Sequence, residues 1–244
     1  MNRQVVAVMA GALALAGVTA WAIGDDGERL GPLPAGERPP LALLTSLPLV
    51  FGESFGLSAG GSPALSRLEQ RYHVMPIGVA DAASLKGQKL LLMAHPRAQP
   101  AEVLVELDQW VRDGGRVLLL ADPKLDWPSE RAFGDRLRPP PAFADTGLLV
   151  HWGLRLVGPL QAGPALRSGG EREVLTSSPG KLEATGQCRA EVEEFIARCP
   201  IGKGSVTVIA DADFINVEDE HALDGPIEDN LDLLIEELAR LDSR

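Results

Sequence analysis

Short apolar runs recur along the chain from residue 41 onward, separated by turn-forming and amphipathic stretches. Residues 41–44, 89–94, 116–121 and 205–210 are mostly apolar, and residues 73–79 form a further candidate strand. Short apolar runs between turn signals are typical of strands that are buried on both faces. The pattern therefore predicts a sheet that lies inside the domain.

Two longer segments have the apolar spacing of a helix. Residues 100–113 place apolar side chains three and four positions apart, at Val103, Leu104, Leu107, Trp110 and Val111. The C-terminal segment repeats this spacing at Leu231, Leu234, Ile235, Leu238 and Leu241. Ser62-Pro63 predicts the start of a third helix, because serine is a good N-cap and proline suits the first helical position. Strands that alternate with helices predict an α/β fold with a doubly wound, mostly parallel sheet and helices on both faces.

The part of the chain between the fourth and the last strong strand is less regular. It is rich in proline up to residue 141, and residues 158–180 have the glycine and proline content of a loop. A short helix is predicted at residues 146–152, and shorter strands at residues 181–188 and 195–200. We expect these pieces to be additions to the central sheet.

The N-terminus carries an uncharged apolar segment at residues 5–23. Arg3 precedes it and Asp25-Asp26 follow it, which favours an orientation with the N-terminus inside the cell and the rest outside. Its length suits one uncleaved transmembrane helix in the bacterial inner membrane. A cleaved signal peptide is the alternative, with small-x-small sites at residues 18–20 and 20–22. Both interpretations export the folded part to the periplasm.

The chain divides into three parts on this pattern. Residues 1–23 are the anchor or signal, and residues 24–40 are a linker rich in proline and glycine. Residues 41–244 form the periplasmic α/β domain.

The negative net charge of the chain excludes some classes of binding partner. The formal net charge is −11, which argues against nucleic acid, because a phosphate backbone requires a basic surface. With a single tyrosine and 5% aromatic residues, the chain also has few platforms for stacking bases.

The chain has two cysteines, Cys188 and Cys199. An even count is compatible with a disulfide in an oxidising compartment, and a hairpin of residues 181–188 and 195–200 would bring the two together. Two free, half-buried thiols are the alternative. No metal centre is predicted, because no second pair of cysteines or histidines has ligand spacing.

Three stretches carry a likeness to a known family. They are the unit from Leu90 to Pro123 with its Gly114-Gly115 turn, the opening Leu44-Thr45-Ser46-Leu47-Pro48-Leu49, and Ala210-Asp211-Ala212-Asp213-Phe214-Ile215. Together they resemble the periplasmic domain of the gliding-motility auxiliary (GldG-like) family of ABC-type transport proteins. The resemblance implies a flavodoxin-like or glutamine-amidotransferase-like domain beside membrane helices, with permease and ATPase subunits as partners.

The residues give no complete catalytic site. The turn after the strand at residues 89–94 is Ala94-His95-Pro96-Arg97, without the cysteine nucleophile of an amidotransferase, and no G-x-S-x-G elbow exists. Gly202-Lys203-Gly204 lacks the spacing of a phosphate-binding loop. We therefore expect no enzyme activity and no cofactor.

The ends of the predicted strands carry polar side chains instead. Ligands of doubly wound sheets lie outside the carboxyl ends of the strands, where this chain has Ser46, His95, Asp122, Asp211 and Asp213. Carboxylates there suit Mg²⁺ or Ca²⁺, although aspartates also cap helices and close turns for local reasons. We interpret this rim as a surface that binds a partner or ligand.

Three functions follow from these features. The first is a non-catalytic, membrane-anchored accessory component of an ABC-type transport system. The second is a periplasmic module that binds a small polar ligand at the rim. The third is a hydrolase with an unrecognised carboxylate site.

Overall fold

The computed structural model describes residues 29–52, 61–159, 161–170, 172–191, 193–217 and 228–243. The predicted anchor or signal at residues 1–23 and the first part of the linker lie outside these ranges. Within the described ranges, no helix has the length and apolar character needed to cross a membrane.

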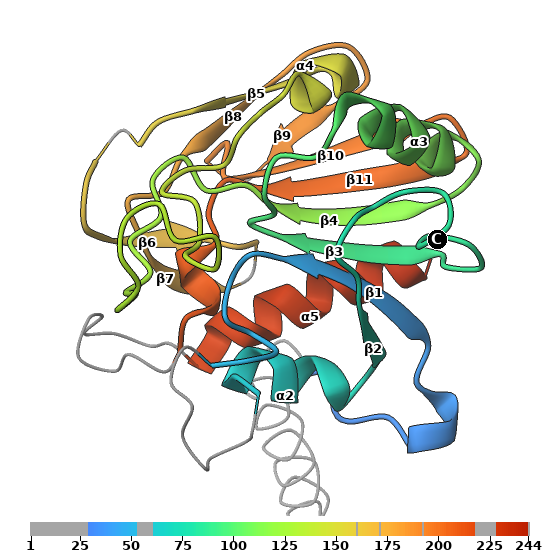
Figure 1. Ribbon diagram of the computed structural model, residues 1–244, viewed down its shortest axis with the longest axis horizontal. Coiled ribbons are helices and arrows are strands. Elements are labelled where there is room, and N and C mark those ends of the chain that lie inside the picture. Colours follow the sequence, from blue (N-terminus) through green and yellow to red (C-terminus); the bar gives the residue numbers. More distant parts are fainter. Residues whose placement is uncertain are drawn as a thin grey trace, which may run out of the picture.

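A central sheet of seven strands organises the described residues (Figure 1). Its strand order is β2 (His73–Pro76), β1 (Pro40–Thr45), β3 (Leu90–Ala94), β4 (Arg116–Leu120), β11 (Gly204–Ile209), β10 (Ile196–Ile201) and β9 (Arg189–Glu191). The strands from β2 to β11 pair in parallel, whereas β10 pairs antiparallel with both of its neighbours. The sheet is therefore mixed.

Helices cover both faces of the sheet. On one face lie α3 (Ala101–Arg112) and α4 (Leu148–Trp152), and on the other lie α2 (Pro63–Glu69) and α5 (Glu228–Asp242) (Figure 1). The hydroxyl of Ser62 caps α2 by accepting the amide of Leu65 at 3.1 Å. Beyond α3, Gly114 has φ +123°, which a residue with a side chain rarely adopts. The start of α2 and both ends of α3 and α4 lie close to where the sequence predicts.

The core lies between the sheet and the helices. Every residue of β3 is buried and apolar, as are the four residues of β4 that follow Arg116. Val103, Leu107 and Val111 form the buried stripe of α3. The apolar runs of the sequence thus correspond to the innermost strands.

The prediction of a doubly wound, mostly parallel, flavodoxin-like or amidotransferase-like sheet is wrong. Ile201 pairs with Gly204, so only Gly202 and Lys203 join β10 to β11. A two-residue connection makes an antiparallel hairpin, since a parallel pair needs a long crossover. Gly202 has φ +59°, and a Cβ at Gly204 would collide with the carbonyl oxygens of Val111 and Gly115. Residues 77–89, between β2 and β3, contain no helix either.

The region predicted as a loop at residues 158–180 contains two strands. β6 (Pro164–Ser168) and β7 (Glu173–Ser177) form one antiparallel ribbon, and β5 (Leu154–Val157) and β8 (Lys181–Ala184) form another. β6 has no fully buried residue, so it lacks the apolar signal that marks the central strands. The described residues also include two 3-10 turns, η1 (Ala35–Glu37) and η2 (Asp213–Ile215).

Cys188 and Cys199 form a disulfide at the antiparallel edge of the sheet. The hairpin that brings them together is β9 with β10, in which Arg189 pairs with Arg198. The expected pairing of residues 181–188 with 195–200 is not the one formed, because β8 pairs with β5 instead. Both cysteines are buried.

We predict that replacing both Cys188 and Cys199 with serine lowers the free energy of unfolding. The bond closes a loop with a sequence separation of 11, and the chain-entropy model gives about 3 kcal/mol for a loop of this size. Urea unfolding of the oxidised and doubly substituted chains measures the difference. Two reactive thiols in the denatured, unreduced chain would contradict the bond.

Candidate functional site

Three aspartates meet where two neighbouring parallel strands end. Leu120 of β4 pairs with Ile209 of β11, so the continued register brings Asp122 beside Asp211. Asp213 follows as the first residue of η2. One carboxylate oxygen from each residue lies within 4.8 Å of the others. We call Asp122, Asp211 and Asp213 the carboxyl cluster.

Each carboxyl of the cluster accepts hydrogen bonds from backbone amides. Asp122 accepts the amides of Lys124 at 2.8 Å and Ala212 at 2.9 Å, and Asp211 accepts that of Phe214 at 2.9 Å. All three aspartates are buried, with exposed fractions of 0%, 0% and 4%. The cluster therefore ties the chain after β4 to the chain after β11.

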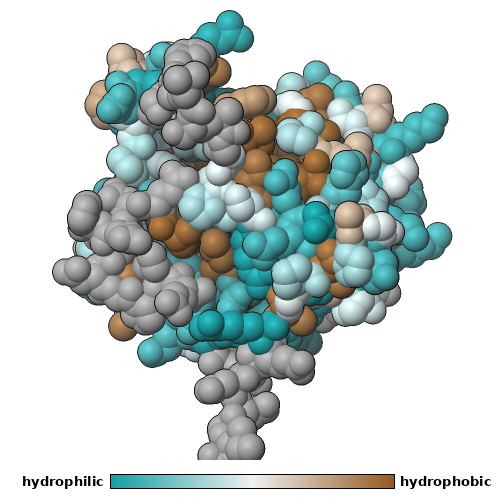
Figure 2. Space-filling view, turned by 90° about the horizontal axis from the view of Figure 1, so that it is seen from below, coloured by the Kyte–Doolittle hydropathy of each residue, from teal (hydrophilic) through white to brown (hydrophobic). Residues whose placement is uncertain are grey.

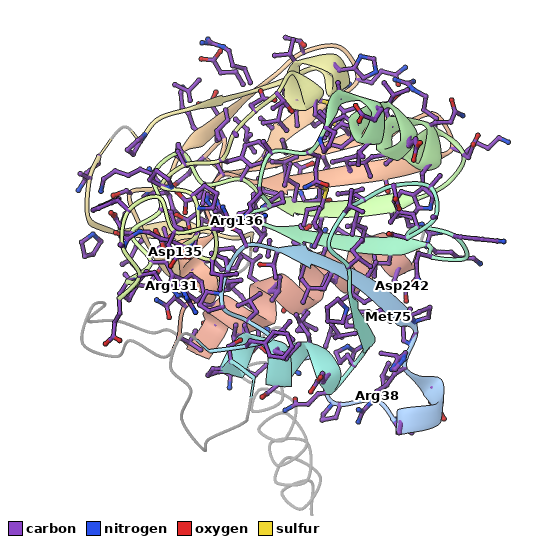
Figure 3. The ribbon with its side chains drawn as sticks, viewed as in Figure 1. Arg38, Met75, Arg131, Asp135, Arg136 and Asp242 are labelled. Carbon is purple, nitrogen blue, oxygen red and sulfur yellow. A yellow bond between two sulfur atoms is a disulfide. The ribbon has the colours of Figure 1, made fainter. Side chains whose placement is uncertain are left out.

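Residues 124–143, which we call the cover, close over this end of the sheet. The amide of Asp126 donates to Asp213 Oδ2 at 2.8 Å, and the amide of Phe143 donates to the carbonyl of Asp122 at 2.7 Å. Figure 3 shows Arg131, Asp135 and Arg136 of the cover at this end, opposite Arg38 and Met75.

Ser46 and His95 meet at the ends of β1 and β3. The Ser46 hydroxyl donates to the His95 carbonyl at 2.5 Å, and His95 Nε2 lies 2.9 Å from the carbonyl of Pro140 in the cover. That carbonyl can only accept, so Nε2 carries the proton. Burial lowers the pKa of His95, which keeps the ring neutral. Within the described residues, no hydrogen bond joins Ser46 or His95 to the carboxyl cluster.

The predicted rim is thus assembled in two groups, and most of it is covered. The structure brings together Asp122, Asp211 and Asp213 in one group, and Ser46 and His95 in the other. His95 is fully buried and Ser46 is half-buried. Four of the five residues are therefore out of reach of a partner while the cover is in place.

Burial changes the ionisation of the cluster. Loss of hydration raises the pKa of Asp122 to about 6, that of Asp213 to about 8, and that of Asp211 well above its usual range. The charge of Asp122 raises the latter two further, whereas the backbone donors act in the opposite direction. At neutral pH Asp213 therefore keeps its proton, and burial among the other two carboxyls favours the protonated form of Asp211. Asp211 Oδ2 is buried with no hydrogen-bond partner, and an unpaired oxygen there costs less free energy when protonated than when charged.

The cluster could exchange these protons for a divalent cation. Ca²⁺ takes six to eight oxygen ligands, and Mg²⁺ usually keeps several waters. The cluster supplies three carboxylates, with the Thr176 hydroxyl beside Asp211, and backbone amides already occupy both oxygens of Asp122. Protons match this donor set better than a metal that needs many ligands.

A second polar group, which joins the start of the cover to the end of β7, could not be foreseen from the sequence. Lys124 Nζ lies 2.5 Å from Asp126 Oδ1 and 3.1 Å from Ser178 Oγ, and the Ser178 hydroxyl donates to Asp126 at 2.5 Å. Ser178 is fully buried with φ +51°. It follows β7, whose region has the composition of a loop. The only sequence signal for this polar group is the polar, proline-rich stretch that begins at Lys124.

A cavity lies away from the rim, near the starts of β1 and β2. Its volume is about 470 Å³, and its lining residues are Ala35, Arg38, Pro40, Glu69, Tyr72, His73 and Val74. The covered rim and this cavity are therefore separate features of the molecule.

No family model and no curated protein matches this chain. Among solved structures, the mmIFT52 N-terminal domain is similar, with 14% identity, a TM-score of 0.52, and coverage of 84% of this chain and 98% of that one. The cytoplasmic protein STM1381 from Salmonella typhimurium LT2 has 11% identity and a TM-score of 0.50, with coverage of 83% and 99%. An exo-β-1,4-mannosidase, Op5Man5 from Opitutaceae bacterium strain TAV5, has 14% identity and a TM-score of 0.49; 84% of this chain aligns, spanning 36% of the mannosidase. At these identities the first two likenesses concern the fold alone.

The raised pKa values predict that stability falls as pH rises. Between about pH 4 and pH 8 the folded chain keeps the Asp213 proton while the unfolded chain loses it, so the free energy of unfolding decreases. The slope is on the order of 1 kcal/mol per pH unit for each retained proton. Asp108, whose pKa is lowered, loses its stabilising contribution only near and below pH 4.

Urea unfolding in EDTA from pH 5 to 8 measures how the free energy of unfolding changes with pH. Asp213→Asn should make this slope less steep, whereas Asp113→Asn at an exposed position should leave it unchanged. Stability that rises over this range would contradict the burial of protonated carboxyls.

We also predict that His95→Ala loosens the cover without unfolding the sheet. The variant loses the partly buried hydrogen bond between His95 and Pro140, and such a bond contributes roughly 0.5–1.5 kcal/mol. Amide exchange should accelerate in residues 138–143 and remain slow in β3 and β4. The exposed His73→Ala serves as the control. Unchanged exchange in the cover would show that His95 does not hold it.

Proposed function

We propose that this chain is a non-catalytic accessory component of an ABC-type transport system, held on the outer face of a bacterial inner membrane. In this proposal the domain acts by binding its partner subunits. The observation that carries the non-catalytic part is the closure of the strand ends, where α/β domains hold their ligands.

The polar groups at the strand ends are engaged with one another and with the backbone. The carboxyl cluster closes the loops after β4 and β11, and His95 holds the cover. A small ligand at the rim would have to displace residues 124–143. The closed rim therefore supports a binding role for other surfaces of the domain.

The serine beneath the cover does not make a hydrolase. A serine nucleophile needs a base that accepts its proton and an open path to the substrate. Ser178 is buried, and the Lys124 ammonium beside it is ion-paired with Asp126. This arrangement favours a structural role for Ser178 rather than that of a nucleophile.

Export is supported by two independent features. The apolar segment at residues 5–23 follows Arg3 and precedes two aspartates, as in an anchor with the N-terminus inside. The disulfide between Cys188 and Cys199 suits an oxidising compartment. The assignment to a transport system rests on the resemblance of three sequence stretches to the GldG-like family.

A partner protein could reach the cover only at its outer, solvent-exposed surface. Phe133 and Leu137 are 87% and 66% exposed, respectively, and the Arg138 guanidinium lies 4.3 Å from the centre of the Phe133 ring. Exposed aromatic and arginine side chains are common at the centres of protein interfaces. We therefore place the contact with the permease on this surface.

The test is affinity purification of the tagged full chain from detergent-solubilised membranes. We expect a multispan permease and an ATPase to purify with it. Replacing Phe133 and Leu137 with serine should reduce their recovery about tenfold, since a central contact contributes roughly 1–3 kcal/mol. Val150→Ser, on α4, is the matched control because Val150 is 65% exposed.

Two results would contradict the proposal. Recovery of the chain from membranes without a permease or ATPase would remove its assignment to a transport system. Turnover of a substrate by the purified chain, abolished by Asp213→Asn, would show that the carboxyl cluster is catalytic.

A further inference from the structure

The first described residues lie along α2 on one face of the domain. The amide of Leu33 donates to the carbonyl of Gln70 at 2.8 Å, and Arg67 Nη2 donates to the carbonyl of Leu30 at 2.9 Å. Arg71 also donates to the carbonyl of Gly31. We call residues 29–33 the strap.

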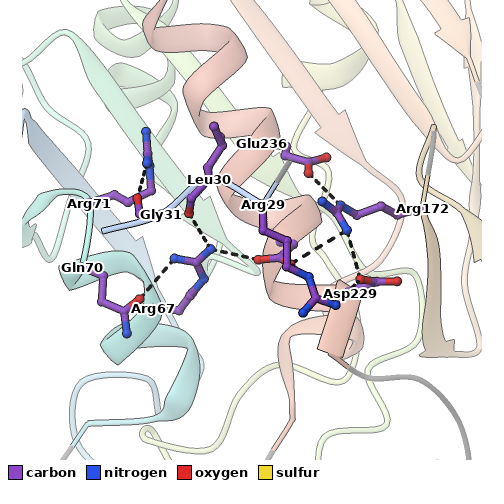
Figure 4. A network of polar contacts seen from close by, with 10 residues as sticks. Arg29, Leu30, Gly31, Arg67, Gln70, Arg71, Arg172, Asp229 and Glu236 are labelled. Atoms are coloured by element: carbon purple, nitrogen blue, oxygen red, sulfur yellow. Dashed lines mark hydrogen bonds and ion pairs between the residues drawn. The ribbon is translucent and has the colours of Figure 1, made fainter. Parts of the chain in front are cut away.

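Ion pairs join the strap to the start of α5 (Figure 4). Arg29 lies 3.3 Å from Asp229 and 3.1 Å from Asp232, measured between the nearest nitrogen and oxygen atoms. Arg67 of α2 reaches the same Asp232 at 2.9 Å. The Arg29 side chain is 59% exposed, so solvent partly screens its two pairs, whereas Arg67 and Asp232 are 16% and 9% exposed and their pair is better shielded.

The network continues to the ribbon of β6 and β7. Arg172 lies 3.0 Å from Asp229 and 2.7 Å from Glu236, and its side chain is 10% exposed. The strap is therefore fixed to α2, to α5 and, through α5, to the ribbon. Its position relative to the folded domain is set by several contacts rather than by one.

The length of chain before the strap limits how far the domain can be from an anchor. Five residues, 24–28, separate Ile23, the last residue of the apolar segment, from Arg29. An extended chain spans at most about 3.5 Å per residue, so Arg29 lies within roughly 20 Å of the end of the segment.

We propose that the face formed by α2 and α5 is the membrane-facing surface of the domain, and that it lies against the phospholipid headgroups. This inference rests on the proposed anchoring by residues 5–23. On this face hydrophilic and hydrophobic areas lie side by side (Figure 2). The net charge of −11 gives the domain no general attraction to anionic lipid, so the placement depends on the tether and not on charge. The short tether and the strap hold the domain in this orientation.

Energy transfer to the lipid surface tests the orientation in the full chain. The chain is reconstituted without reductant in vesicles of phosphatidylethanolamine and phosphatidylglycerol that carry a headgroup-linked acceptor. Cys188 and Cys199 stay bonded, so a thiol dye labels only an introduced cysteine. Ser66→Cys puts the dye on α2, and Val105→Cys puts it on α3, where Val105 is 69% exposed.

Transfer from position 66 should exceed transfer from position 105 severalfold. The two helices lie on opposite faces of the sheet, and layers so placed are on the order of 20 Å apart. Replacing both Arg29 and Arg67 with alanine should reduce this contrast by releasing the strap. Arg155→Ala, which breaks an ion pair with Glu183 away from the strap, should leave it unchanged.

The outcomes separate this inference from the proposed function. Equal transfer from both positions in a chain that stays with the vesicles would overturn the orientation and leave the anchoring intact. Greater transfer from position 105 would assign the membrane to the opposite face. Recovery of the chain from cells as a soluble protein would overturn both the anchoring and the orientation.

Discussion

Three carboxyl groups share a small, water-poor volume at the ends of β4 and β11, and much of this end of the molecule depends on how their charge is neutralised. Ionised carboxylates at this separation repel one another strongly when water is excluded. The fold resolves the repulsion by holding protons on Asp211 and Asp213 and by directing backbone amides at all three groups. The loops after both strands and the start of the cover take their course from those amide contacts.

This arrangement determines which surfaces remain for function. A doubly wound domain usually keeps its strand ends open for a ligand, whereas this chain closes them with residues 124–143 and with His95. The side chains that offered the best chemistry in the sequence are therefore part of the interior. In our proposal, the outer surface of the cover contacts the permease, and the face that carries the strap lies against the membrane.

The innermost strands and the helices could be predicted from the sequence because their apolar spacing is strong. The runs around Leu91, Leu118 and Val208 are buried on both faces, and α3 buries the stripe expected from its sequence. The sequence also predicted that Asp122 and Asp211 lie at the same edge of the sheet, because the carboxyl ends of parallel strands meet there. The direction of β10 could not be predicted from its apolar pattern alone, although Gly202 and Lys203 form the two-residue turn that makes it antiparallel to β11.

The strands β6 and β7 were missed because their pairing depends on contacts outside their own sequence. The burial of the predicted rim was missed because nothing local indicates that the proline-rich residues 124–143 fold over it.

The most direct test of this account is the ionisation of the aspartates themselves. The side-chain carboxyl carbons of Asp122, Asp211 and Asp213 can be followed by NMR from pH 3 to pH 9, with assignments from single Asp→Asn variants. The account predicts that Asp213 titrates near pH 8, that Asp122 titrates near pH 6, and that the pKa of Asp211 lies well above the usual range of an aspartate. Titration of all three groups near pH 4, as in an exposed carboxyl, would show that the cluster is open to water and would contradict the closed rim.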